Sequence, residues 1–121
     1  MKHIRVILGG GLLLIALAAE ATPQIEVSVS PTYGFEPVNL VVAVVTASHA
    51  DNRILRVVAE SEEFVSSSDR QLEGTGSPRV ARFEFRAIPA GAYEIRATLI
   101  GPNGKVRAEA DAAAMVISRD F

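Results

Sequence analysis

Hydrophobic and polar residues alternate with a period of two along much of the chain after residue 24. The alternation is clearest in segments 81–87, 92–99 and 105–110, which are separated by Ile88-Pro89-Ala90-Gly91 and by Gly101-Pro102-Asn103-Gly104. A period of two is typical of strands with one buried and one solvated face, and both interruptions carry turn residues. These segments therefore predict three strands joined by two tight turns.

The same pattern predicts four further strands. They cover residues 25–30, 38–47 and 53–60, with a short edge strand near 70–73, and the last strand continues from 105 to 117. A bulge is expected at 111–114, where the alternation weakens. Short strands at close spacing with turn residues between them predict an all-β, seven-stranded antiparallel sandwich.

The segment Val38–Ala47 is a nearly continuous run of β-branched residues. Such a run predicts a central strand covered on both faces. One face would meet the opposite sheet, and the other would be covered by a partner, by another domain or by arginine side chains. Val41 and Val45 are the candidate interaction residues on this strand.

Residues 31–37 are predicted to form a loop, because prolines stand at both ends and a glycine in the middle. We expect its two aromatic residues, Tyr33 and Phe35, to fold back over the end of the core. The alternative is an exposed aromatic contact, and exposed rings beside a groove would favour glycan binding.

The corner formed by Pro89, Gly91 and Tyr93, followed by the turn at 101–104, resembles bacterial immunoglobulin-like and fibronectin type III-like domains. In such sandwiches a tyrosine at this position hydrogen-bonds to upstream backbone. A similar corner occurs in transthyretin-like and carboxypeptidase regulatory-like modules, so the resemblance implies an architecture rather than a function. The sequence departs from antibody-type domains because it has no cysteine and no tryptophan.

The first residues read as a secretory signal peptide. Lys2 and Arg5 precede an apolar run, and small residues then offer cleavage after Ala21 or after Ala18; retention as an anchor is the third alternative. We expect a leader at 1–21 and an exported domain at 22–121, periplasmic or extracellular, with no integral membrane segment once the leader is removed. The absence of cysteine excludes a lipoprotein anchor.

Composition narrows the function classes. The 121 residues carry a formal net charge of −2, and the charges of both signs are interspersed. No basic patch with aromatic residues is present, which argues against nucleic acid as a partner. The lack of cysteine excludes thiolate metal sites and thiol catalysis.

Candidate catalytic chemistry is sparse. Ser48, His49 and Asp51 have the residue types of a hydrolase triad, but they lie next to one another in one turn and no nucleophile elbow is present. Glu62, Glu63 and Asp69 form a local acidic cluster without an ordered calcium-binding pattern. The sequence analysis therefore predicts no enzyme activity, no metal and no cofactor.

The predicted function is an exported, non-catalytic binding or accessory module that contacts an envelope protein. The alternative is a carbohydrate- or cell-wall-binding module. The candidate interaction residues are Tyr33, Phe35, Val41 and Val45, with the loops at 31–37 and 61–78 as further candidates.

Overall fold

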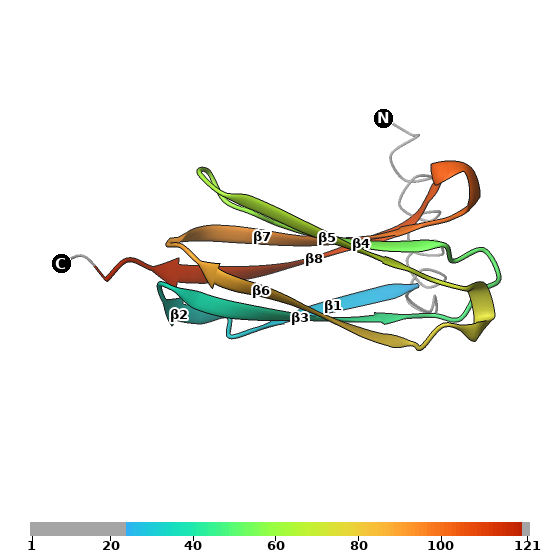
Figure 1. Ribbon diagram of the computed structural model, residues 1–121, viewed down its shortest axis with the longest axis horizontal. Helices are drawn as coiled ribbons and strands as arrows, with labels where there is room; N and C mark the ends of the chain where they lie inside the picture. Colours follow the sequence, from blue (N-terminus) through green and yellow to red (C-terminus); the bar gives the residue numbers. More distant parts are fainter. Residues whose placement is uncertain (1–23, 120–121) are drawn as a thin grey trace, which may run out of the picture.

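The computed structural model describes residues 24–119, so the predicted leader at 1–21 lies outside the described residues. Eight strands and two short 3₁₀ turns follow one another along the chain: β1 (Ile25–Ser30), β2 (Tyr33–Phe35), β3 (Val38–Thr46), β4 (Ile54–Glu60), β5 (Val65–Gln71), η1 (Gly74–Gly76), β6 (Val80–Ile88), β7 (Gly91–Ile100), η2 (Pro102–Gly104) and β8 (Val106–Ile117). They form two sheets that face each other (Figure 1). The predicted all-β sandwich is confirmed.

The smaller sheet has the order β1-β3-β6, and the larger has the order β2-β8-β7-β4-β5. Neighbouring strands are antiparallel except for β2, which runs parallel to β8 with Tyr33 opposite Met115 and Phe35 opposite Ile117. The prediction of seven strands is wrong, because the segment expected to be a loop at 31–37 contains β2. Strand β2 has only three residues, which carry too little alternation to predict a strand that forms by pairing with β8.

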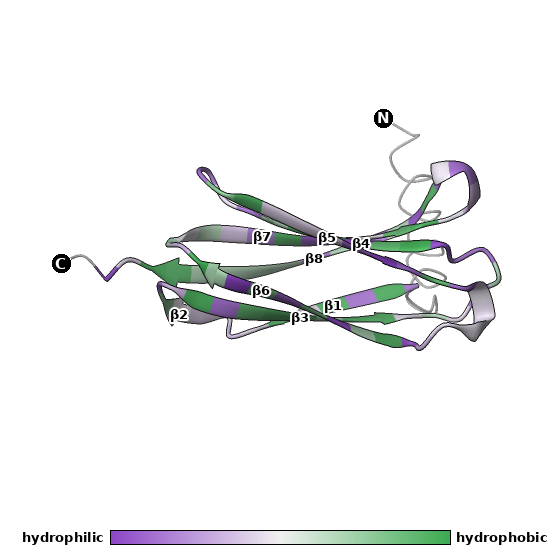
Figure 2. Cartoon of the chain, in the orientation of Figure 1, coloured by the Kyte–Doolittle hydropathy of each residue, from purple (hydrophilic) through white to green (hydrophobic). Residues whose placement is uncertain are grey.

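The core fills the space between the sheets with the inward residues of every second position. Its members with the least exposure include Leu40, Val42, Val44, Leu55, Val57, Ile95, Ala97 and Leu99. In β3 the buried residues are Leu40, Val42, Val44 and Thr46, and those between them are exposed or half-buried. Figure 2 shows β3 as hydrophobic along most of its length, whereas polar and apolar residues alternate in β6.

Strand β8 places a row of alanines toward the core: Ala108, Ala110, Ala112 and Ala114. Alanine is a strong helix former, yet this segment is strand, because its pairing with β7 satisfies the backbone and its inward face joins the core. The short side chains allow β8 to lie close to β1 of the other sheet, and the half-buried Val27 of β1 packs against the same core as these alanines. Tertiary packing therefore overrides local propensity here.

Two register irregularities lie elsewhere than expected. They occur at Val38/Leu40 opposite β6 and at Leu99/Ile100 opposite β8, rather than at 111–114. In the first, Ala87 has a φ of 55°, and its N–H donates to Asn39 Oδ1 at 2.9 Å. The side chain of Asn39 thus replaces a ladder hydrogen bond that the bulge removes.

The predicted edge strand near 70–73 is displaced, because the observed edge strand β5 covers Val65–Gln71. Its residue Arg70 bridges the two sheets. The guanidinium lies 4.7 Å from the centroid of the Phe83 ring and donates to the Arg82 carbonyl of β6 at 2.8 Å. A charged side chain pointing inward from an edge strand is one way in which proteins limit edge-to-edge pairing.

Candidate binding surface

Tyr33 and Phe35 point outward from β2, which is an edge strand of the larger sheet. Their side chains are 71% and 50% exposed. The expectation that they fold back over the core is wrong. Because β2 pairs with β8, the two rings are fixed by strand register to the outer side of the sheet, and Gly34 between them takes the inward position.

Three residues of the neighbouring strands continue this apolar surface. Register places Met115 beside Tyr33 on one side and beside Ala92 on the other, and Ala113 lies two residues before Met115 on the same face. Met115 is 39% exposed, and both alanines are exposed. We call Tyr33, Phe35, Ala92, Ala113 and Met115 the aromatic face.

A shallow hollow of about 220 Å³ lies within the aromatic face. Its lining residues are Thr32, Ala92, Tyr93, Ala113, Ala114 and Met115. The lining is mostly apolar, with Thr32 the one small polar residue among the six. The hollow therefore suits an apolar side chain of a partner better than a polar group.

Glu36 fixes one border of the aromatic face. Its Oε1 accepts a hydrogen bond from the Ala90 N–H, and its Oε2 accepts from the Ser118 hydroxyl and the Arg119 N–H. The Ala90 bond is the largest cause that holds the pKa of Glu36 below its ordinary value, followed by the bond from Arg119. The Arg119 side chain donates to the Glu36 carbonyl and lies 5.7 Å from the centroid of the Phe35 ring. One carboxylate thus joins the end of β2, the β6–β7 corner and the segment after β8.

Tyr93 fixes the other border, at the corner between β6 and β7. Its ring is 3% exposed, and its hydroxyl donates to the Pro89 carbonyl at 2.8 Å. This is the upstream backbone contact that the corner interpretation requires. The ring also meets Phe64 edge-on, with centroids 6.3 Å apart, which brings the β4–β5 turn against the corner.

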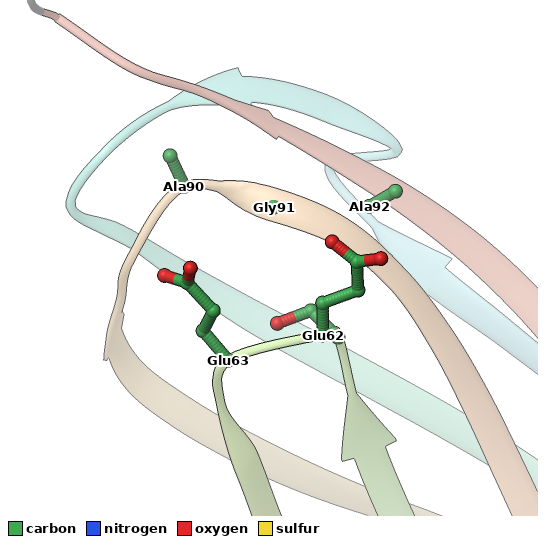
Figure 3. A pocket seen from close by; sticks show the side chains of 6 residues that line it. Glu62, Glu63, Ala90, Gly91 and Ala92 are labelled. Atoms are coloured by element: carbon green, nitrogen blue, oxygen red, sulfur yellow. The ribbon is translucent and has the colours of Figure 1, made fainter.

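Gly91 allows this close approach of the turn. A Cβ at Gly91 would lie 3.0 Å from the Ser61 Cβ and 3.3 Å from Tyr93 Cε2. A second hollow, of about 320 Å³, opens between the turn and the corner and is lined by Ser61, Glu62, Glu63, Ala90, Gly91 and Ala92. Figure 3 shows the carboxylates of Glu62 and Glu63 extending from the turn toward residues 90–92.

Val41 and Val45 lie on the other side of the sandwich, on the outer face of β3. Val41 is half-buried between Ser30 and Glu84, and Val45 is 36% exposed beside Val80. The structure therefore does not bring these valines together with Tyr33 and Phe35. Val45 and Val80 form a small apolar surface, whereas the aromatic face is larger and richer in aromatic side chains.

The residues with potential catalytic chemistry do not assemble into a site. His49 is exposed, and its Nδ1 accepts the Asp51 N–H at 3.0 Å within the turn. Within residues 24–119, no group of three or more histidine, aspartate or glutamate side chains is arranged to hold a metal ion. Nor does this part of the chain contain a helix with the length and apolar character needed to cross a bilayer.

Sequence reasoning missed Met115, Ala113 and Ala92. Met115 was expected in the last strand, but no neighbour could be assigned to it without the β2–β8 pairing. The signal that was present is parity: Ala113 and Met115 alternate with the buried Ala114 and Val116. Assigning the outer face of the last strand in this way would have placed methionine among the exposed residues.

No protein-family model matches the sequence, and no curated protein matches it either. Among solved structures, a superoxide reductase (neelaredoxin) from Ignicoccus hospitalis is similar, with 12% identity and a TM-score of 0.57 over 78% of this chain and 80% of that chain. A family 76 glycoside hydrolase from a bovine Bacteroides thetaiotaomicron strain is also similar, with 17% identity and a TM-score of 0.56. That match covers 78% of this chain and 20% of the hydrolase chain. At these identities the likeness shows the fold alone.

The similarity to superoxide reductase corrects one prediction. The sequence predicted that the chain is not an enzyme, because no catalytic motif was found in it. That prediction is wrong, because an enzyme has a similar fold. A function can be grafted onto a sandwich by a few residues, so the fold does not exclude catalysis.

Proposed function

We propose that this chain is an exported immunoglobulin-like module that binds a protein partner in the cell envelope through the aromatic face. The immunoglobulin-like assignment is supported by the strand order and by the hydrogen bond between Tyr93 and the Pro89 carbonyl. Export is supported by the signal-peptide pattern at residues 1–21. The match to a fifth of a glycoside hydrolase chain supports the use of such a sandwich as one part of a larger protein.

The observation that carries the proposal is the exposure of Tyr33, Phe35 and Met115 side by side on one sheet face. Tyrosine, phenylalanine and methionine are enriched at protein–protein interfaces, because they bury much apolar area with few polar groups. The three side chains stand on paired strands, and the Glu36 and Tyr93 contacts hold both borders of the surface. A partner would therefore meet a surface that needs little ordering on binding.

A protein partner fits this surface better than a sugar. Glycans require several hydrogen-bonding groups around a ring platform, whereas the hollow beside Tyr33 is lined mainly by alanine and methionine. Carbohydrate binding remains the second candidate because both aromatic rings are exposed beside a hollow, and because one similar structure is a glycoside hydrolase.

The test is a comparison of two variants of the tagged full-length protein after mild crosslinking in its native envelope. Tyr33→Ser/Phe35→Ser removes both rings, and Val80→Ser/Val106→Ser removes two similarly exposed apolar side chains at the starts of β6 and β8, away from the aromatic face. We expect the wild type and the valine variant to capture one common partner that the aromatic variant loses. Equal capture by both variants would contradict the proposal.

The same variants distinguish the carbohydrate alternative. Purified wild-type protein would be mixed with isolated cell-wall polysaccharide and sedimented. Sedimentation that depends on Tyr33 and Phe35, in the absence of any captured protein, would assign the aromatic face to a glycan instead.

A further inference from the structure

The aromatic face and the acidic hollow adjoin each other. Ala92 lines both, so that the apolar hollow with Met115 lies on one side of it and the hollow with Glu62 and Glu63 lies on the other. Figure 1 shows that β2, the β4–β5 turn, the β6–β7 corner and the end of β8 all lie at one end of the sandwich. A ligand at this end would meet apolar surface and carboxylates at the same time.

The two carboxylates have no compensating charge, unlike four of the acidic residues on the two sheets. Among residues 24–119, neither Glu62 nor Glu63 forms an ion pair or a side-chain hydrogen bond. The four that form ion pairs are Asp69 with Arg56, Glu84 with Arg86, and Glu94 and Asp111 with Arg96.

Two cations near the aromatic face are already engaged. Arg119 lies over Phe35, and its side chain is hydrogen-bonded to the Glu36 carbonyl. Arg96 forms ion pairs with Glu94 and Asp111. The charge that remains uncompensated beside the apolar hollow is therefore negative. A partner that covers the hollow also approaches these carboxylates, and a cation on the partner would reduce their electrostatic cost.

The turn that carries the carboxylates is held in place. The Ser61 N–H donates to the Phe64 carbonyl at 2.8 Å, and the Phe64 ring packs edge-on against Tyr93. A Cβ at Gly91 would lie only 3.0 Å from the Ser61 Cβ, so β7 passes close to the turn. The two carboxylates thus extend from a fixed support, which limits the entropy lost when a partner binds.

From these observations we propose that the docking segment of the partner protein carries a lysine or arginine next to an apolar side chain. The apolar side chain enters the hollow between Ala92 and Met115, and the cation lies between Glu62 and Glu63. This inference rests on the proposed function, because it specifies the chemistry of the partner that the aromatic face binds.

The test uses the full-length protein, purified from the envelope in mild detergent, and a random peptide display library as the probe. Peptides selected on the wild type are then measured on three variants: Glu62→Gln/Glu63→Gln, Tyr33→Ser/Phe35→Ser, and the charge-matched control Glu26→Gln/Glu73→Gln. Glu26 and Glu73 are exposed and distant in sequence from both hollows. Thermal unfolding of each variant checks that the fold is retained.

We expect the selected peptides to contain lysine or arginine adjacent to an apolar residue. Their affinity should fall by about 5–10-fold on the Glu62→Gln/Glu63→Gln variant, which lies within the range of about 2–30-fold for two solvent-screened ion pairs. It should fall by roughly 30-fold or more without the two aromatic rings, as for interface hot spots. The control variant should bind like the wild type, and high salt should weaken wild-type binding to the level of the glutamine variant.

The selected peptides could require Tyr33 and Phe35 and yet show no preference for basic residues and no loss of affinity on the Glu62→Gln/Glu63→Gln variant. That result would overturn this inference and leave the proposed function standing. If no selected peptide depends on the two rings, both this inference and the proposed function fail. Self-association that requires Tyr33 would overturn the inference in favour of a second copy of the chain as the occupant.

Discussion

The corner tyrosine offers a sharp test of how the β6–β7 end of the sandwich is held. The substitution Tyr93→Phe removes one hydroxyl and leaves the ring, which is 3% exposed and packed edge-on against Phe64. The change therefore deletes the 2.8 Å hydrogen bond to the Pro89 carbonyl without creating a large cavity. Tyr33→Phe is the matched control, because the Tyr33 side chain is 71% exposed and its hydroxyl makes no hydrogen bond within residues 24–119.

The expected loss follows from the surroundings of the acceptor. An intramolecular hydrogen bond contributes about 0.5–1.5 kcal/mol net, and more when a fully buried partner is left unsatisfied. Pro89 is half-buried, so water can reach its carbonyl in part, and we expect a loss of about 1 kcal/mol in the free energy of unfolding. For a domain of this size, about 1 kcal/mol corresponds to a decrease in Tm of roughly 4–8 °C.

Urea and thermal unfolding followed by circular dichroism measure both quantities, provided that the transitions are two-state. The Tyr33→Phe protein should unfold like the wild type, within about 0.5 kcal/mol. Equal stability of Tyr93→Phe and wild type would refute the role of the hydroxyl. Equal losses in the two variants would show that the effect does not come from the corner hydrogen bond.

Two other changes test the borders of the aromatic face. Gly91→Ala should destabilise the protein by about 1–3 kcal/mol, because the new Cβ would lie 3.0 Å from the Ser61 Cβ. The control in urea unfolding is Gly76→Ala, where a Cβ meets nothing within 4 Å. Similar losses of stability in both variants would contradict the argument. The pKa of Glu36 is lowered from 4.5 by hydrogen bonds from Ala90 and Arg119, so its ionised form is stabilised by folding. This stability is present above the unfolded pKa and is lost as pH falls through the lower folded pKa. Glu36→Gln should therefore be less stable than the wild type at neutral pH and should lose less stability below about pH 4.5, and parallel pH profiles of Tm would contradict this.

Much of the fold could be predicted because its strands alternate regularly. The segments around β6, β7 and β8 have one apolar and one charged face, so a period of two predicts both that they are strands and which of their residues face the core. Only the last residues of β5 were predicted as strand, since Val65–Gln71 is rich in serine and exposed along nearly all its length. An edge strand that contributes little to the core leaves little apolar pattern in the sequence.

The candidate site could be predicted less well, because it depends on contacts between distant segments. Tyr33 and Phe35 were candidates from their residue types, but their exposure follows from pairing with residues 115–117. Parallel pairing of such a short strand has no local signature. The position of Glu62 beside Ala92 likewise depends on the contact between the β4–β5 turn and the β6–β7 corner.

The measurement that tests the central claim most directly is site-specific photocrosslinking in the cells that produce the protein. A photoreactive benzophenone amino acid replaces Tyr33 in one variant and Val106 in another; Val106 is exposed at the start of β8, whose other end pairs with β2. We predict a single crosslinked protein adduct of defined mass from position 33 and none of that mass from position 106. The absence of an adduct at position 33, or the same adducts at both positions, would contradict the assignment of the aromatic face as the surface that binds a protein partner.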